Sequence, residues 1–324
     1  MKKDPAAGYI FEKEIFDLLS ESGYFNVKTE KLRGRGASHQ IDAFGTLAIP
    51  TAFTYPIRLI AEAKCYSSTI QLYQIRSFLG VIKDISENYI VGEDDQRNTP
   101  NRYLDTGCFF SATPFSKSVQ DYAWAHNIFL VSFSGIDEMF SIITRIRSFV
   151  SGIPPDQLKV VTKDNLVALY LVWKNQRPLE NANPSLGIGI IDNVYPVILV
   201  GKKDWQTRIK IPPNSDKISA EKTSRSHKTN GTIFHLNIEA KSGPDEKVSF
   251  NLPNGIAEKI VDRIDKTRFG QGIFSLDIPV IVKDGGGTMR RFIQVDVSLP
   301  DKESYMKTIK SGFNRTGFNR TGFN

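Results

Sequence analysis

The sequence predicts an α/β fold with a central mixed sheet flanked by helices, followed by a second, β-rich domain of α+β type. Within the first 150 residues the expected order is helix, three strands, helix, strand, helix, strand, helix, which is typical of a sheet with helices on its faces. Later segments are mostly short apolar strands separated by turn residues. A chain of 324 residues, 40% of them hydrophobic, is long enough for about two cores.

The first helix is predicted from Asp4, an N-cap followed by proline, to about residue 22, where Gly23 stops it. A second long helix follows the capping sequence Ser67–Thr69. Its apolar stripe includes Ile75 and Phe78. The other elements of this half are strands near 25–30, 40–44, 57–64, 106–111 and 128–133, and helices over 114–126 and 135–149.

Glycine and proline in Ser151–Pro155 mark the expected end of the first domain. The expected organisation is a first domain over 1–150, a linker over 151–165, a basic β-rich domain over 166–310 and a tail over 311–324. The tail repeats the pentapeptide Gly312–Thr316, which cannot build a core, so we expect it to be disordered.

The second domain is predicted to contain several strands and one helix. The polar, basic segment 217–230 is expected to be mobile, and Asp284–Gly287 is expected to join the last two strands as a hairpin. The strands are predicted over 187–191, 196–200, 232–240, 247–252, 274–283 and 289–298, and the helix over about 253–268.

Positive charge is concentrated in the second half of the chain. Residues 1–150 contain 16 Lys and Arg against 17 Asp and Glu, a net charge of −1, whereas residues 151–324 contain 26 against 18, a net charge of +8. Neutralised phosphates supply much of the affinity for nucleic acids, so a basic module favours such a partner. A lysine-rich surface without a nucleic-acid partner is the alternative.

Several classes of protein are disfavoured. No apolar run approaches the roughly 20 residues of a membrane helix, and the acidic, amphipathic N-terminus is unlike a signal peptide. Cys65 and Cys108 lie at or in expected core strands, where buried reduced thiols are expected instead of a disulfide. The histidines lack metal-ligand spacing, which argues against a zinc site. We therefore expect a cytoplasmic protein without a membrane partner.

Charged residues end two neighbouring predicted strands. Glu62 and Lys64 project from one face of the apolar strand 57–64, because side chains alternate along a strand, and Asp42 ends the strand before it. Unpaired buried charges are costly. Two carboxylates that hold a hard cation beside a lysine form a site for phosphodiester hydrolysis. Glu12, on the first helix, is a fourth candidate, with a solvated helix carboxylate as its alternative.

Six further polar residues are candidates for substrate binding, because they flank the same strands: Arg33, Arg35, His39, Gln40, Gln71 and Gln74. The two arginines alternate with glycines that let a phosphate backbone approach closely. The alternatives are a flexible surface loop for the arginines, an ordinary hydrogen-bonded loop residue for His39, and a polar helix face for the two glutamines that open the second helix.

Four motifs together resemble the PD-(D/E)xK nuclease superfamily, and within it the Mrr-like restriction endonucleases. The motifs are Gly8–Glu12 (GYIFE), Gly23–Phe25 (GYF), Gln40–Asp42 (QID) and Ala61–Lys64 (AEAK). Two later segments, Gly107–Ser116 and Ala123–Ile128, resemble the strand, helix and strand that follow in that family. The resemblance covers about residues 5–135 and implies a restriction-endonuclease-like core.

The resemblance also implies roles for individual residues. Asp42 and Glu62 would bind Mg²⁺, for which Mn²⁺ can substitute, with the carbonyl of Ala63 as a further ligand. Lys64 would position or help deprotonate the attacking water and offset charge on the scissile phosphate. Glu12 would support this metal or a second one. Many Mrr-like members have glutamine where this chain has Glu62, so no narrow claim about the substrate follows.

The expected function is that of a Mg²⁺-dependent DNA endonuclease of the restriction or defence type. DNA is the expected substrate, and a homodimer or a defence-system protein is a possible further partner. A repair or junction nuclease of the same fold is one alternative. A nucleic-acid-binding or sensor subunit of a defence complex that does not cut is another. The intact acidic set favours an enzyme, because a binding protein has no need for three charges at the edge of a buried strand.

Overall fold

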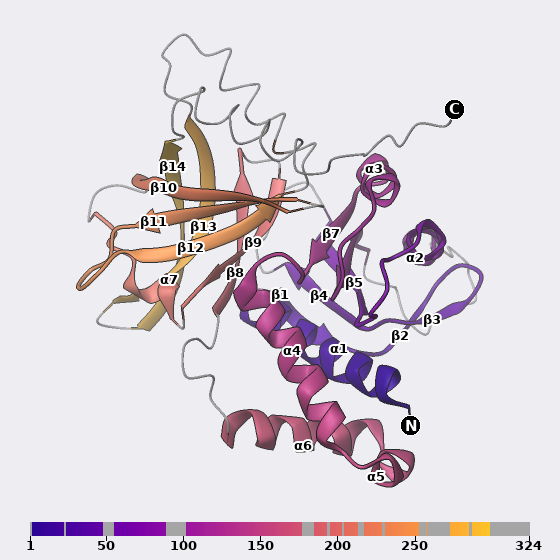
Figure 1. Ribbon diagram of the computed structural model, residues 1–324. Coiled ribbons are helices and arrows are strands. Elements are labelled where there is room, and N and C mark those ends of the chain that lie inside the picture. The colour runs from indigo at the N-terminus through magenta and orange to yellow at the C-terminus, as the bar shows by residue number, and fades with distance from the viewer. Residues whose placement is uncertain are drawn as a thin grey trace, which may run out of the picture. The chain divides into compact units, whose positions relative to one another are not determined.

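The architecture is taken from a computed structural model (Figure 1). The described residues are 2–22, 24–47, 55–88, 102–176, 185–192, 195–202, 204–212, 217–228, 231–252, 257, 273–284 and 287–298. The chain divides into two compact units, Met1–Gly187 and Ile188–Asn324.

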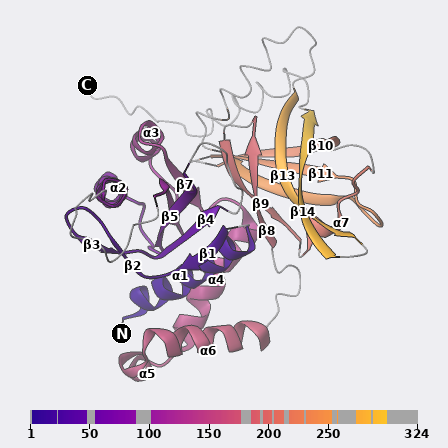
Figure 2. The same cartoon turned by 180° about the vertical axis from the view of Figure 1, so that it is seen from behind.

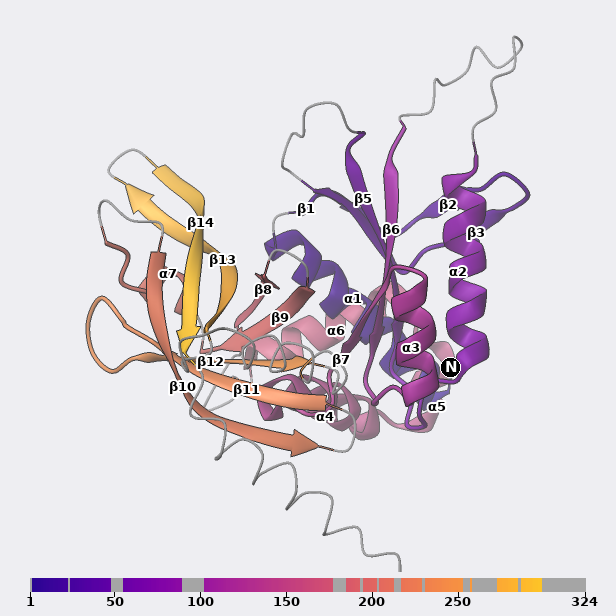
Figure 3. The ribbon, with the colours of Figure 1, turned by 90° about the horizontal axis from the view of Figure 1, so that it is seen from above.

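The first unit has three layers, with a mixed sheet between helices on both faces, as the sequence predicted (Figures 1 and 3). Its helices are α1 (Lys3–Glu21), α2 (Leu72–Ser86), α3 (Lys117–Ala125), α4 (Asp137–Gly152), α5 (Pro155–Val160) and α6 (Lys163–Gln176). Its strands are β1 (Tyr24–Lys28), β2 (Lys31–Arg33), β3 (Ser38–Gln40), β4 (Ala43–Leu47), β5 (Ile57–Lys64), β6 (Leu104–Ser111) and β7 (Ile128–Ser132).

Within the described residues the central sheet has the order β1-β4-β5-β6-β7. Strand β4 pairs antiparallel with β1 and β5, whereas β5, β6 and β7 are parallel to one another. Helices α2 and α3 cover one face, where Ile60 and Phe109 pack against Phe78 and Phe115. Helix α1 crosses the other face and packs against α4 and α6. Strand β5 is therefore the middle strand of the sheet, with helices over both faces of the sheet.

The expected linker over 151–165 is instead part of the first unit. Pro154 and Pro155 begin α5 instead of ending the domain, because proline is well suited to the first turn of a helix. Leu158 of α5 and Tyr170 of α6 are buried, and the Tyr170 hydroxyl donates to Glu14 of α1 at 2.8 Å. These contacts hold α5 and α6 against the first unit, so the division falls after Gly187, well beyond the expected residue 150.

Helix α2 begins later than the sequence predicted. The expected cap was Ser67–Thr69, but the N-cap is Gln71. Ile70 forms a parallel β-bridge with Phe115, which keeps the backbone extended up to that point. The Gln71 N–H then donates to the side-chain oxygen of Gln74 at 2.7 Å, which satisfies one of the free amides at the start of the helix.

The second unit is built around a closed barrel of seven described strands, in the order β10-β11-β12-β9-β8-β13-β14 (Figures 1 and 2). Its described elements are β8 (Ser185–Ile191), β9 (Tyr195–Gly201), α7 (Trp205–Arg208), β10 (Lys217–Lys228), β11 (Gly231–Ile238), β12 (Glu246–Leu252), β13 (Ile273–Asp284) and β14 (Gly287–Ser298). Parallel pairing between β10 and β14 closes the barrel. Three stacked or edge-on phenylalanines, Phe234, Phe250 and Phe274, help to fill it.

The β-rich character of this unit is confirmed, and β13 and β14 form the predicted hairpin, with Asp284 opposite Gly287. The expectation of a mobile segment over 217–230 is wrong for residues 217–228, which form β10. Barrel closure gives this polar strand backbone partners on both sides, in β11 and β14, so it needs no apolar pattern of its own. The helix expected over 253–268, apart from Ala257, and the tail over 311–324 lie outside the described residues.

Cys65 and Cys108, both in the described part of the chain, are buried and unpaired, as expected. Burial raises the pKa of the Cys65 thiol to about 11, which makes it a poor nucleophile at neutral pH. None of the described helices is both long and apolar enough to cross a membrane.

Candidate active site

Strand register brings Asp42 to the end of β5. The antiparallel pairing between β4 and β5 reaches Ala43 opposite Ala61, and Asp42 is the residue just before β4. Its side chain continues the ladder, since the Ala63 N–H donates to Asp42 Oδ2 at 2.9 Å. The N–H and C=O of one residue point to the same side in an antiparallel ladder. The Ala63 carbonyl therefore faces the same side as the Asp42 carboxylate.

Lys64 joins the two carboxylates. Its Nζ lies 3.4 Å from Asp42 Oδ2 and also forms an ion pair with Glu62 Oε1. The side chains of Asp42, Glu62 and Lys64 are 12%, 23% and 25% exposed, so the set is largely buried yet open to solvent on one side. The sequence predicted this convergence, and the structure brings the three residues together. Asp42 does not end a strand as expected but comes just before β4, and the antiparallel pairing places the start of β4 beside the end of β5.

Burial and the charge of Asp42 act together on the pKa of Glu62, but burial and the neighbouring charges act against each other on the pKa of Lys64. Burial raises the pKa of Glu62, and the neighbouring Asp42 raises it further. Burial alone would lower the pKa of Lys64, but the carboxylates of Glu62 and Asp42 outweigh it and raise the pKa above the ordinary lysine value. Lys64 is therefore an ammonium at neutral pH, held between two carboxylates that repel each other.

The β6 side fixes the end of β5. The Ala112 N–H donates to the carbonyl of Lys64 at 3.0 Å, and Thr113 Oγ1 donates to the carbonyl of Ser68 at 2.9 Å. The hydroxyl of Ser111, which is fully buried, accepts from the Thr113 N–H at 3.0 Å. These bonds fix the end of β5 and the loop after it from the β6 side, whereas Asp42 bonds β5 from the β4 side.

Glu12 approaches from α1. Its side chain is 16% exposed, and Oε2 lies 2.6 Å from Nζ of Lys163, the first residue of α6. Helix α1 packs against β4 and β5. Burial raises the pKa of Glu12, and the charge of Asp42 raises it further. Lys163 was missed by sequence reasoning, because it lies 151 residues from Glu12 and within the expected linker.

The expected substrate-binding loop is fastened to the far end of α2. In the β2–β3 hairpin, the Gly36 and Ala37 N–H groups donate to the Asp84 carboxylate at 2.7 and 3.1 Å, and His39 Nε2 lies 2.7 Å from Asp84 Oδ2. A Cβ at Gly34 would lie 2.1 Å from Asp84 Oδ2, so only glycine lets the hairpin close on this carboxylate. This contact agrees with the alternative stated for His39 in the sequence analysis, an ordinary hydrogen-bonded loop residue.

The remaining candidates divide into exposed and structural residues. Arg33 and Arg35 are exposed on the fastened hairpin, as is Gln40, whose Nε2 contacts the Ile41 carbonyl at a long 3.5 Å. Gln71 and Gln74 are occupied in capping α2, and Gln71 also donates to the Thr69 carbonyl at 3.0 Å. The capping contacts account for both glutamines without a substrate.

The donor set at the strand end fits a hard divalent cation. Two carboxylates and a backbone carbonyl are oxygen donors, and Mg²⁺ in proteins is commonly held by one or two carboxylates together with water. Across the described ranges, no group of three or more His, Cys, Asp or Glu side chains is arranged to hold a metal. The site would therefore rest on Asp42 and Glu62, with the Ala63 carbonyl as the backbone donor, and not on an all-side-chain cage.

Comparisons with known proteins do not assign this chain to a family. No family model matches the chain, and no curated protein matches it. Among solved structures, the chain is similar to a protein of unknown function, AF1548, at 18% identity and a TM-score of 0.31, over 50% of this chain and 78% of that one. A likeness at this level carries no argument about fold or function.

Proposed function

We propose that this protein is a Mg²⁺-dependent DNA endonuclease of the restriction or defence type, with its catalytic site at Asp42, Glu62 and Lys64. The observation that carries the proposal is the convergence of two largely buried carboxylates, from neighbouring strands, on one lysine. Such a group costs stability unless it serves a charged ligand. The motifs that resemble PD-(D/E)xK nucleases coincide with these residues.

Each residue has a role in the proposed hydrolysis. Asp42 and Glu62 would hold the metal, with the Ala63 carbonyl turned to the same side. A bound Mg²⁺ would lower the pKa of a water ligand and offset the charge that develops on the phosphate. Lys64 carries a raised pKa, so it would act as a charge that orients the water and the phosphate, and not as the base that removes a proton.

Charge supports DNA as the partner. With the division after Gly187, the first unit contains 20 Lys and Arg against 20 Asp and Glu, and the second contains 22 against 15. The entire net charge of +7 therefore lies in the barrel unit and the residues that follow it. In the proposed enzyme, a neutral catalytic unit is joined to a basic unit that binds DNA phosphates.

Cleavage of a supercoiled plasmid tests the proposal. We expect the wild type to nick or linearise the plasmid with Mg²⁺ and to be inactive with EDTA. Lys64→Ala is expected to remove cleavage. Lys174→Ala is the matched control, because it removes a lysine bound to a different carboxylate of the first unit, Glu14. Equal cleavage by wild type and Lys64→Ala would refute the assignment.

The substrate class is tested separately. Cleavage is compared on methylated, unmethylated, branched and single-stranded DNA, because nucleases of this kind also act in repair and junction resolution. Preference for branched DNA would favour the repair alternative over restriction. Tight, salt-dependent DNA binding without cleavage and without Mg²⁺ or Mn²⁺ binding would favour a protein that only binds.

A further inference from the structure

Lys163 brings a second lysine to the candidate site from outside the strand motifs. It is the first residue of α6, and its Nζ lies 2.6 Å from Glu12 Oε2 and 4.8 Å from the centre of the Tyr9 ring. Both contacts are to α1, the helix that carries Glu12 across the sheet. The side chain of Lys163 is 45% exposed, whereas that of Glu12 is 16% exposed. The ammonium therefore covers the carboxylate from the solvent side.

Glu12 and the strand-end residues form one electrostatic group. The pKa of Glu12 is raised by burial and then by Asp42, and it is lowered by Lys163 and Lys64. Helix α1, which carries Glu12, packs against β4, which Asp42 precedes, and against β5, which contains Glu62. The charge on Glu12 therefore acts on Asp42, one of the two carboxylates that would hold the metal.

The charges of this group are unequal. The three carboxylates of Glu12, Asp42 and Glu62 face the two ammonium groups of Lys64 and Lys163, which leaves one negative charge. One divalent ion would change this to one positive charge, which complements the single negative charge of a phosphodiester. A second ion would leave three positive charges in a partly buried site, which is costly.

We propose that Lys163 acts as a built-in cation at Glu12, so that the site takes a single divalent ion, at Asp42 and Glu62, and admits a second only when Lys163 is removed. This inference rests on the proposed function, because it assumes the metal site at the end of β5. It assigns Glu12 to Lys163 and not to the first metal ion. Lys163 is then a positioning residue that sets the metal stoichiometry.

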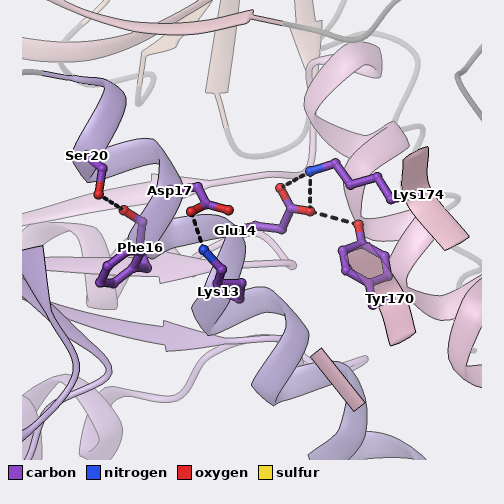
Figure 4. A network of polar contacts seen from close by, with 7 residues as sticks. All are labelled: Lys13, Glu14, Phe16, Asp17, Ser20, Tyr170 and Lys174. Atoms are coloured by element: carbon purple, nitrogen blue, oxygen red, sulfur yellow. Dashed lines mark hydrogen bonds and ion pairs between the residues drawn. The ribbon is translucent and has the colours of Figure 1, made fainter. Parts of the chain in front are cut away.

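The other lysine of α6 provides the comparison. Lys174 Nζ lies 2.7 and 2.9 Å from the two carboxylate oxygens of Glu14, which also accepts from the Tyr170 hydroxyl (Figure 4). This pair joins the same two helices as Lys163 and Glu12. It lies outside the carboxylate set, so it reports what the loss of an α1–α6 ion pair does by itself.

Mn²⁺ is titrated into the full chain, and the free ion is quantified by electron paramagnetic resonance. This titration measures directly how many ions each chain binds. We expect one ion for the wild type, for Lys174→Ala and for Lys163→Arg, which keeps the charge. We expect two ions for Lys163→Ala, because the half-buried Glu12 carboxylate then lacks the cation that contacts it. Asp42→Asn is expected to remove the ion that the wild type binds.

A double variant covers the case in which Lys163→Ala does not fold. Glu12→Gln with Lys163→Gln removes the ion pair without a change in net charge, and we expect one Mn²⁺ with a Kd within about threefold of the wild type. A weakening of about tenfold or more would overturn the inference, because Glu12 would then be a ligand.

The two hypotheses fail in different ways. Two ions on the wild type, or a single ion on folded Lys163→Ala, would overturn the role of Lys163 and leave the proposed nuclease intact. A wild type that binds no Mn²⁺ would overturn both.

Discussion

Replacement of Lys64 by alanine tests whether the strand-end carboxylates need a cation. Lys64→Ala removes the ammonium that contacts both Asp42 and Glu62. At 3.4 Å, the Lys64–Asp42 attraction is about 5 kcal/mol for an effective dielectric constant of 20. Desolvation of the three groups and the partial exposure of Lys64 offset much of this. We therefore expect a net loss of about 2 kcal/mol, below the roughly 3–5 kcal/mol of a fully buried pair.

The same variant should respond to metal. Without Lys64, the two carboxylates repel each other without compensation, so Mg²⁺ should stabilise Lys64→Ala more than it stabilises the wild type. At a Mg²⁺ concentration ten times the Kd, binding adds about 1.4 kcal/mol. Addition of Asp42→Asn to Lys64→Ala should abolish this gain, because one of the two ligands is then lost.

The assay is urea unfolding with and without Mg²⁺, in which unfolding is detected by pulsed hydrogen exchange and mass spectrometry. Peptides from β5 and β6 report the first unit alone, which matters because a two-unit chain need not unfold in one step. Lys174→Ala is the control: it should lose stability but gain nothing extra from Mg²⁺. A Lys64→Ala variant as stable as the wild type, or one with no larger Mg²⁺ response, would refute the reasoning.

Three further outcomes follow from other contacts. The pKa of Asp84 is lowered by the His39 hydrogen bond and the hairpin amides, so its stabilisation is present above the ordinary carboxyl range and is lost as pH falls through the lowered pKa. The stability difference between the wild type and Asp84→Asn should therefore shrink below about pH 4. Phe250→Ala should destabilise the barrel peptides by about 3–5 kcal/mol, as measured by the same exchange method, because Phe250 is fully buried against Phe234. Glu14→Gln should increase exchange in α6, and unchanged protection there would contradict the Glu14 contacts with that helix.

Local patterns were sufficient to predict the central sheet of the first unit. The order of helices and apolar strands predicted a central sheet, and Asp42 was grouped with Glu62 and Lys64 because it was assigned to the strand just before theirs. The structure has this register, with Ala43 opposite Ala61. The metal and the nuclease activity were inferred from the residue types, and they stay predictions.

Contacts between residues far apart in the chain could not be predicted from the sequence. Nothing near Lys163 in the sequence points to Glu12, since the pair forms only when α6 packs on α1. Pro154 and Pro155 resemble a linker locally, but buried Leu158 makes α5 part of the unit. Local composition could not give this boundary, because tertiary packing decided it.

The barrel shows the same limit for strands. Residues 217–228 are polar and were expected to be mobile, yet they form β10 because β11 and β14 satisfy their backbone on both sides. Closure of a barrel depends on pairing between segments about 75 residues apart, such as Lys217 with Gln294, and periodicity within one strand does not encode it.

Single-turnover cleavage of plasmid DNA by wild type, Asp42→Asn and Glu14→Gln in Mg²⁺ tests the central claim most directly. Both variants replace a carboxylate that contacts a lysine in the first unit, but only Asp42 lies at the proposed metal site. We expect Asp42→Asn to lose more than about 100-fold in rate, which exceeds the usual effect of losing a group that only supports a metal ligand. Glu14→Gln should cleave at the wild-type rate. Cleavage by Asp42→Asn at the rate of Glu14→Gln would contradict the account.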